Sequence, residues 1–176
     1  MTVEVKKHYV YISGSIKKVS DNINILPLCK TLSNKLLSND FFLVSAAGSH
    51  IGNYIFGAVL KYLEENNYEQ IRKRLIIDPI PNSLEKSEIE KHRIRLLSKY
   101  KSIIFISGGS GTREEYKLAK KLNLELIPIP YTGGEAKNIF DELKKNNLTD
   151  LTVLEKEVEI NKIVDTVIHT LTGKRG

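Results

Sequence analysis

The residues best suited to chemistry form one glycine-rich stretch, Ser107-Gly-Gly-Ser-Gly-Thr-Arg-Glu-Glu115, between an apolar run and a helical segment. Its closely spaced glycines allow the backbone to approach a ligand and to adopt positive φ angles. A helix that begins here directs its first free N–H groups and the positive end of its dipole at the ligand. The stretch is therefore a candidate phosphate site. Its candidate ligand-binding residues are Gly108, Gly109, Ser110, Gly111, Thr112 and Glu115.

Glu115 adds a carboxylate in the first turn of that helix, where it could accept a hydrogen bond from a ribose hydroxyl or bind a polarised ring nitrogen. A second interpretation is purely structural. The same glycines would make an ordinary tight turn between a strand and a helix, and a carboxylate near a helix N-terminus is favourable by itself.

Two more turns of small residues follow predicted strands. Their candidate ligand-binding residues are Gly14, Ser15, Gly48, Ser49, His50 and Gly52. A histidine in such a turn could bind a phosphate or a ribose, but we favour a local structural role for His50. On the helix before the glycine-rich stretch, Arg93 or Arg95 could bind a phosphate through two hydrogen bonds. The alternative for either arginine is a solvated basic helix face.

Five short β-branched segments alternate with amphipathic segments along the chain. The strands are expected at His8–Ser13, Arg74–Asp78 and 41–45, 103–106 and 124–129, with the first strand in the centre. This alternation predicts an α/β fold, a Rossmann-like open parallel sheet of about five strands with helices on both faces. The glycine turns then meet at the carboxyl ends of the strands, where open α/β sheets bind ligands.

Several local features refine these elements. A capping box of Ser87 and Glu90 is expected to begin one helix. Gly57, within another helix, is expected to allow close packing against a strand. Pro128 and Pro130 interrupt the last strand, and proline is tolerated only at the end of a strand or in an edge strand, because it donates no ladder hydrogen bond. Gly173 is expected to end the final helix.

Length and composition predict one soluble domain over residues 1–176, with 41% hydrophobic and 27% charged residues. The expected location is the cytoplasm, since Cys29 is the only cysteine and the N-terminal residues form no apolar signal segment. No membrane span, metal site or cofactor is expected. The net charge of +6 suits an anionic ligand, but basic residues are scattered beside acidic ones, which argues against nucleic acid as a partner.

The motifs resemble a known family. Residues Ile12-Ser-Gly-Ser15, 48–52 and 108–112 with Glu115 resemble the SLOG superfamily, whose best-known enzymes carry a Pro-Gly-Gly-x-Gly-Thr-x-x-Glu motif. A sub-branch of this superfamily is more similar: the C-terminal SLOG sensor of the ThsA effectors of Thoeris antiphage defence. The similarity lies in the motifs Arg74-Leu-Ile-Ile-Asp-Pro-Ile-Pro81, His92-Arg93 and 126–134 and in their order. The resemblance covers about residues 8–143.

This resemblance implies a sensor rather than an enzyme. Such sensors bind a cyclic ADP-ribose isomer made by a TIR-domain protein, form oligomers and activate a sirtuin-like effector that consumes NAD. Arg93 and Glu115 would correspond to the family's ligand-binding arginine and glutamate, and the glycine loops would hold the pyrophosphate. The chain is then either a sensor excised from a longer effector or one that serves another effector in trans.

One departure bears on the ligand. The loop after the fourth strand is short and carries no lysine, and Ser107 stands where the phosphoribohydrolase motif has proline. The alternative function is a nucleoside 5′-monophosphate phosphoribohydrolase, in which Arg93 and Glu115 would assist departure of the base. A DNA-processing SLOG relative is a third, less favoured class.

Overall fold

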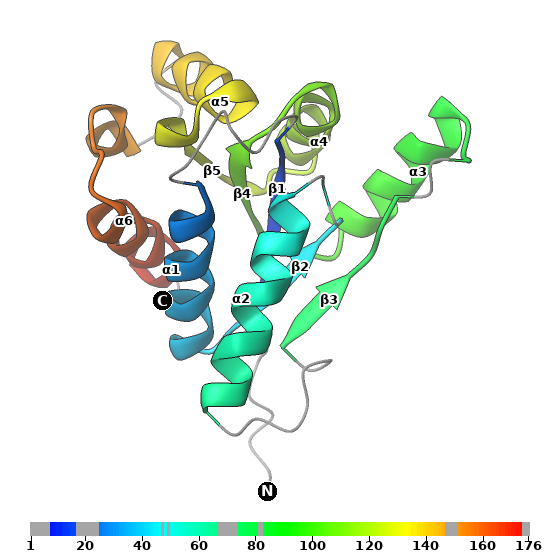
Figure 1. Ribbon diagram of the computed structural model, residues 1–176. Helices are drawn as coiled ribbons and strands as arrows, with labels where there is room; N and C mark the ends of the chain where they lie inside the picture. The colour runs from blue at the N-terminus through cyan, green and yellow to red at the C-terminus, as the bar shows by residue number, and fades with distance from the viewer. Residues whose placement is uncertain are drawn as a thin grey trace, which may run out of the picture.

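A computed structural model describes residues 8–16, 25–46, 48, 50–66, 74–80, 83–146 and 151–173. Its centre is a five-stranded, fully parallel sheet with strand order β3-β2-β1-β4-β5 (Figure 1). The strands are β1 (His8–Ser15), β2 (Phe41–Ser45), β3 (Leu75–Ile77), β4 (Ser102–Ser107) and β5 (Glu125–Ile129). The α/β prediction, with β1 in the centre of the sheet, is confirmed.

Helices cover both faces of the sheet. They are α1 (Ile25–Ser38), α2 (Ile51–Glu65), α3 (Lys86–Leu97), α4 (Ser110–Lys121), α5 (Gly134–Lys145) and α6 (Ile160–Gly173). Two short 3-10 helices, η3 (Pro130–Thr132) and η4 (Leu151–Glu155), flank α5. Helices α1, α2 and α6 pack with Val10 and Ile12 of β1 in one apolar cluster, whereas α3, α4 and α5 pack with Tyr11 in the other.

The two clusters follow from the pleat of buried strands. Successive side chains of β1 and β4 point to opposite faces, and helices shield both faces, so a strand such as β4 is apolar almost throughout. All six residues of β4 are buried. β5 lies at the edge of the sheet, as Pro128 requires. Among the described residues, no helix is both long enough and apolar enough to cross a membrane.

Three local predictions have different outcomes. α6 includes Gly173, the last residue that the structure describes, so the end of this helix at Gly173 stays a prediction. The predicted capping box is wrong: Glu85 is the N-cap of α3, and its backbone N–H donates to Glu88 Oε2 at 3.0 Å, so the helix begins before Ser87. The prediction for Gly57 is also wrong. This residue is exposed on the outer side of α2, and a Cβ atom added to it would meet no atom within 4 Å.

Candidate functional site

A cavity of about 220 Å³ lies at the carboxyl ends of the strands, where β1, the loop after β2, α3 and the start of α4 meet. The glycine turns and the two charged residues singled out in the sequence converge on it. Its lining consists of Tyr11, Ile12, Ser13, Gly14, Ser15, Ala46, Gly48, Ile80, Arg93, Gly111, Thr112 and Glu115.

Glu115 forms the buried acidic centre of this cavity. It lies in the second turn of α4, because the helix begins at Ser110, and not in the first turn as predicted; it is only 6% exposed. The Ser13 hydroxyl donates a short hydrogen bond to Glu115 Oε2, and the Tyr11 hydroxyl donates to Oε1 at 3.1 Å. Both donors lie on β1, and their side chains share one face of the strand. The carboxylate is therefore held in one orientation by two neutral donors.

Burial controls the protonation of this cluster. Removal from water raises the pKa of the Glu115 carboxyl, while the Ser13 hydrogen bond, the Arg93 guanidinium and the Tyr11 hydroxyl oppose the rise, in that order. Burial, followed by the neighbouring carboxylate, raises the pKa of Tyr11 well above its ordinary value. Tyr11 therefore stays a neutral donor at physiological pH.

Arg93 enters the cavity from α3 and is the cation nearest to Glu115. Its Nε lies 3.8 Å from Glu115 Oε1, which is close enough for attraction but too far for a hydrogen bond. Among the described residues this buried Nε has no hydrogen-bond partner. A Cβ atom added to Gly111 would lie 3.2 Å from Arg93 Nη2. The guanidinium thus sits over the N-terminus of α4, and two positive groups face the same space.

The turn between β4 and α4 has an unusual backbone. Ser107 and Gly108 both have positive φ angles, 51° and 100°. A Cβ at Gly108 would collide with Thr112. The Ser107 N–H donates to Thr132 Oγ1 at 2.7 Å, and the Gly108 N–H donates to the Ser15 carbonyl at 2.9 Å. The loops after β1, β4 and β5 are therefore joined by hydrogen bonds.

The turns after β1 and β2 approach each other just as closely. A Cβ at Gly48 would collide with the Gly14 carbonyl oxygen, and one at Gly14 would collide with the Ile106 carbonyl oxygen. Glycine is required at both positions by this close approach of backbones. The small-residue motifs of the sequence therefore build the walls of the cavity.

The structure brings seven predicted site residues into the cavity lining: Gly14, Ser15, Gly48, Arg93, Gly111, Thr112 and Glu115. Gly108, Gly109 and Ser110 form the adjoining turn and the start of α4 without lining the cavity, and Gly52 is buried in the first turn of α2. His50 precedes α2 with φ 62°, and its ring lies 6.4 Å from that of Tyr54. Ser49 lies outside the described residues.

The structure also distinguishes between neighbouring charged residues. Of the two candidate arginines, Arg95 is exposed and lies 3.0 Å from His92 Nδ1, so only Arg93 reaches the cavity. Arg113, within the glycine motif, points away toward α5 and pairs with Glu135 at 3.0 Å and Glu142 at 2.9 Å.

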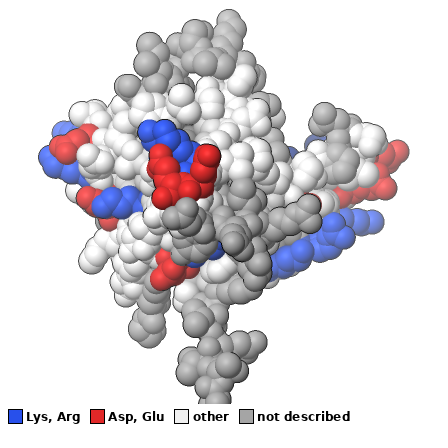
Figure 2. Space-filling model, turned by 60° about the horizontal axis from the view of Figure 1, so that its bottom comes forward, with Lys and Arg blue, Asp and Glu red and all other residues white. Residues whose placement is uncertain are grey.

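Sequence reasoning missed Tyr11 and Ser13. A signal was present, because polar atoms alternate along one face of an otherwise apolar strand. Within the described part of the chain, no three His, Cys, Asp or Glu residues are grouped as metal ligands. On the face shown in Figure 2, acidic and basic side chains of the described residues lie beside one another in small groups.

Comparisons with known proteins agree with this picture. The model of the Sir2- and TIR-associating SLOG family (STALD) matches residues 1–172. Curated relatives named NAD(+) hydrolase ThsA are 24% identical, over 94% of this chain for the protein of Cytobacillus dafuensis and 96% for that of Enterococcus faecium. The chain spans only 40% and 41% of the length of those two proteins.

Solved structures share the fold. The structural-genomics protein TM1055 superposes with a TM-score of 0.58 at 16% identity, covering 75% of this chain and 79% of the other. DNA processing protein A of Helicobacter pylori gives 0.57 at 14% identity, covering 93% and 81%. The molybdenum cofactor carrier protein of Chlamydomonas reinhardtii gives 0.55 at 14% identity, covering 96% and 100%. At such identities these likenesses concern the fold alone.

Proposed function

Since the chain belongs to the Sir2- and TIR-associating SLOG family, we propose that it is a sensor domain that binds a cyclic ADP-ribose isomer and activates an associated effector. One observation carries the proposal. The Arg93 guanidinium, whose buried Nε has no hydrogen-bond partner among the described residues, lies over the N-terminus of α4 beside the buried Glu115 carboxylate. This arrangement offers an anion site and a hydrogen-bond acceptor within one cavity.

The ligand's chemistry matches these two features. A cyclic ADP-ribose isomer carries two phosphates and two riboses. The amides at the start of α4 and the Arg93 guanidinium would bind the pyrophosphate. The negative charge of the pyrophosphate would offset these two positive groups, which face the same space in the free protein. Glu115, oriented by Ser13 and Tyr11, would accept a hydrogen bond from a ribose hydroxyl. Recognition of this kind requires no bond cleavage.

The effector would be an NAD-hydrolysing unit, either in the same polypeptide or in another protein. The support is that the curated relatives are named NAD(+) hydrolase and that this chain spans only about 40% of their length. A signal from a TIR-domain protein and assembly into an oligomer belong to the same proposal. Ligand binding would activate the effector through a difference in ligand affinity between its inactive and active states.

A phosphoribohydrolase is the second candidate, and the raised pKa of Glu115 favours it, because a carboxyl of this kind can transfer protons during departure of a base. The backbone at Ser107 argues against it. That enzyme motif has proline at this position, whereas Ser107 has φ 51° and proline is restricted to about −65°. This turn cannot have the same conformation with proline in place of Ser107.

Isothermal titration calorimetry of the chain with cyclic ADP-ribose isomers would test the proposal, with AMP and ADP-ribose as controls and chromatography of each nucleotide afterwards. We expect one cyclic isomer to bind and to be recovered intact. Arg93→Ala and Glu115→Gln should each weaken binding at least about 100-fold, as expected when a charged partner of a buried ligand group is lost.

Arg95→Ala is the matched control, because Arg95 lies on the same helix and outside the cavity. Its affinity should stay within about twofold of the unaltered chain. Release of free base from AMP, without binding of any cyclic isomer, would reject the sensor in favour of the enzyme.

A further inference from the structure

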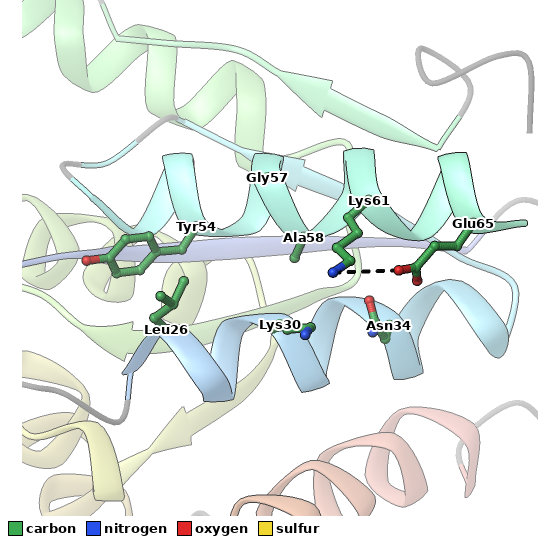
Figure 3. A pocket seen from close by; sticks show the side chains of 8 residues that line it. All are labelled: Leu26, Lys30, Asn34, Tyr54, Gly57, Ala58, Lys61 and Glu65. Carbon is green, nitrogen blue, oxygen red and sulfur yellow. Dashed lines mark ion pairs between the residues drawn. The ribbon is translucent and has the colours of Figure 1, made fainter.

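A second hollow of about 200 Å³ lies on the surface between α1 and α2 (Figure 3). We call it the α1–α2 groove. It is lined by Leu26, Lys30 and Asn34 of α1 and by Tyr54, Gly57, Ala58, Lys61 and Glu65 of α2. It shares no lining residue with the cavity that contains Arg93 and Glu115.

Gly57 is not explained by the fold of this chain. Glycine inside a helix makes that helix less stable than alanine would, and a buried neighbour usually justifies it. Here an added Cβ would meet nothing within 4 Å, and the residue is exposed. The absence of a side chain at Gly57 therefore leaves the floor of the groove open toward the outside.

The groove combines polar side chains with apolar ones that are incompletely covered. Leu26 is 51% exposed at one end, where Figure 3 shows it facing Tyr54 across the two helices. Apolar side chains left open beside a small-residue floor form a surface that another helix can approach closely and from which it can exclude water.

The charges at the rim indicate the chemistry of the occupant. Lys30 is exposed and makes no ion pair among the described residues, and Lys61 on the facing helix is joined only to Glu65 within its own helix, at 3.7 Å. Figure 3 shows Lys30 on α1 and Lys61 on the facing side of α2, with the Lys61 ammonium directed toward Glu65. A partner side chain that enters the groove meets positive charge from both helices.

We propose that the α1–α2 groove is a docking site for an acidic amphipathic helix of another protein. The apolar face of that helix would lie over Gly57 and Ala58 between Leu26 and Tyr54, and its carboxylates would pair with Lys30 and Lys61. A second copy of this chain fits less well, because a symmetric contact centred here brings the lysines of both copies together. The small size of the groove suits a weak, reversible contact.

A direct test uses two fluorescent helical peptides of about 20 residues, long enough to form an amphipathic helix. Both carry leucines along one face, and their flanks carry glutamates in one peptide and lysines in the other. Fluorescence anisotropy should show binding of the acidic peptide at least about tenfold tighter than the basic one. Binding should shift the NMR amide signals of Leu26, Lys30, Tyr54, Gly57 and Ala58.

Two variants locate the contact. Gly57→Leu should weaken binding of the acidic peptide at least about tenfold by filling the floor, and Lys30→Glu with Lys61→Glu should reverse the preference between the peptides. Lys91→Glu with Lys99→Glu is the matched control, because it makes the same change in net charge at exposed positions outside the groove. Circular dichroism confirms that each variant is folded.

Three results would overturn the proposal: no binding at about 1 mM peptide, equal affinity for both peptides, or unchanged affinity in Gly57→Leu. A fourth contrary result could come from sedimentation equilibrium of the chain. A dimer that Gly57→Leu abolishes would assign the groove to a second copy of the chain. None of these readouts involves a nucleotide, so they do not depend on the function proposed above.

Discussion

The Glu115 carboxylate depends on two hydroxyl groups from β1 to remain an acceptor inside the protein. Burial favours its neutral form, and the Ser13 hydrogen bond is the strongest influence that opposes this. In the folded state the pKa is raised, so this group makes the fold less stable as the pH rises from the unfolded-state pKa through the folded-state pKa. The burial of Glu115 therefore places a hydrogen-bond acceptor in the cavity, but its ionisation lowers the free energy of unfolding.

Ser13→Ala and Tyr11→Phe should each raise the pKa of Glu115 further, because each removes a donor to the ionised carboxylate. NMR titration of the Glu115 side-chain carbon measures this directly and needs no ligand. If the ligand requires the carboxylate, the pH below which binding is lost should move upward in the same variants.

Tyr9→Phe is the matched control for this measurement. Tyr9 precedes Tyr11 on the same face of β1 and packs against Phe42 and Tyr100, so removal of its hydroxyl leaves the carboxylate's donors in place. An unchanged Glu115 pKa in both Ser13→Ala and Tyr11→Phe would show that these hydroxyl groups do not hold the carboxylate.

Ser107 makes a second prediction at the scale of one residue. Ser107→Pro should lower the free energy of unfolding by about 2–4 kcal/mol, because proline cannot adopt φ 51° and lacks the N–H that donates to Thr132. Urea unfolding followed by circular dichroism measures this change. Ser107→Gly keeps the N–H and accepts positive φ, so its stability should stay within about 1 kcal/mol of the unaltered chain.

A stable Ser107→Pro variant would mean that the turn can adopt the backbone of the phosphoribohydrolase motif, which would remove the structural objection to the enzyme.

Among the elements, α2 extends from the turn beside the candidate ligand cavity to the outer surface. It begins directly after the turn that contains Gly48, where the Gly52 N–H donates to the Gly48 carbonyl at 2.9 Å. Its inner face packs into the core through Ile55, Val59 and Leu63. Its outer face lines the α1–α2 groove, so α2 connects the turn that borders the candidate ligand cavity with that groove.

Gly57→Ala should stabilise the chain by about 0.5–1 kcal/mol, because alanine is the better helix former and its methyl group enters open space. For a chain of this size that corresponds to a rise in Tm of about 1–4 °C in differential scanning calorimetry. Ala58→Gly in the same helix is the reciprocal control and should lower Tm. A fall in Tm for Gly57→Ala would show that the glycine is needed within the chain itself.

At the scale of the whole molecule, the candidate ligand cavity joins both layers of the fold. Gly48 precedes α2 on one face of the sheet, whereas Arg93 and Glu115 come from α3 and α4 on the other. A ligand bound there contacts both layers at once, and it binds only the folded chain.

A ligand at about 100 times its Kd should therefore stabilise the chain by about 2.7 kcal/mol, or raise its Tm by about 5–10 °C. Differential scanning fluorimetry with each cyclic ADP-ribose isomer measures this shift. Arg93→Ala should abolish the shift and Arg95→Ala should keep it. Equal shifts for both variants would place the ligand elsewhere on the chain.

The sequence alone predicted the five alternating strands, the helices between them and the central place of β1. It also identified Arg93, Glu115 and the glycine turns as candidate ligand residues. These features depend on hydrophobic period, turn residues and the chemistry of proline and glycine, all of which act over a few neighbouring residues.

Only the tertiary structure decided which of these residues meet. Ser13 and Glu115 are 102 positions apart and come together because β1 and β4 pair in one register and α4 packs back on that strand. The contact of Arg93 with the cavity, and the exposure of Gly57, depend on how α3 and α2 are rotated against the sheet. Rotation and register are set by packing between distant segments, which no local pattern encodes.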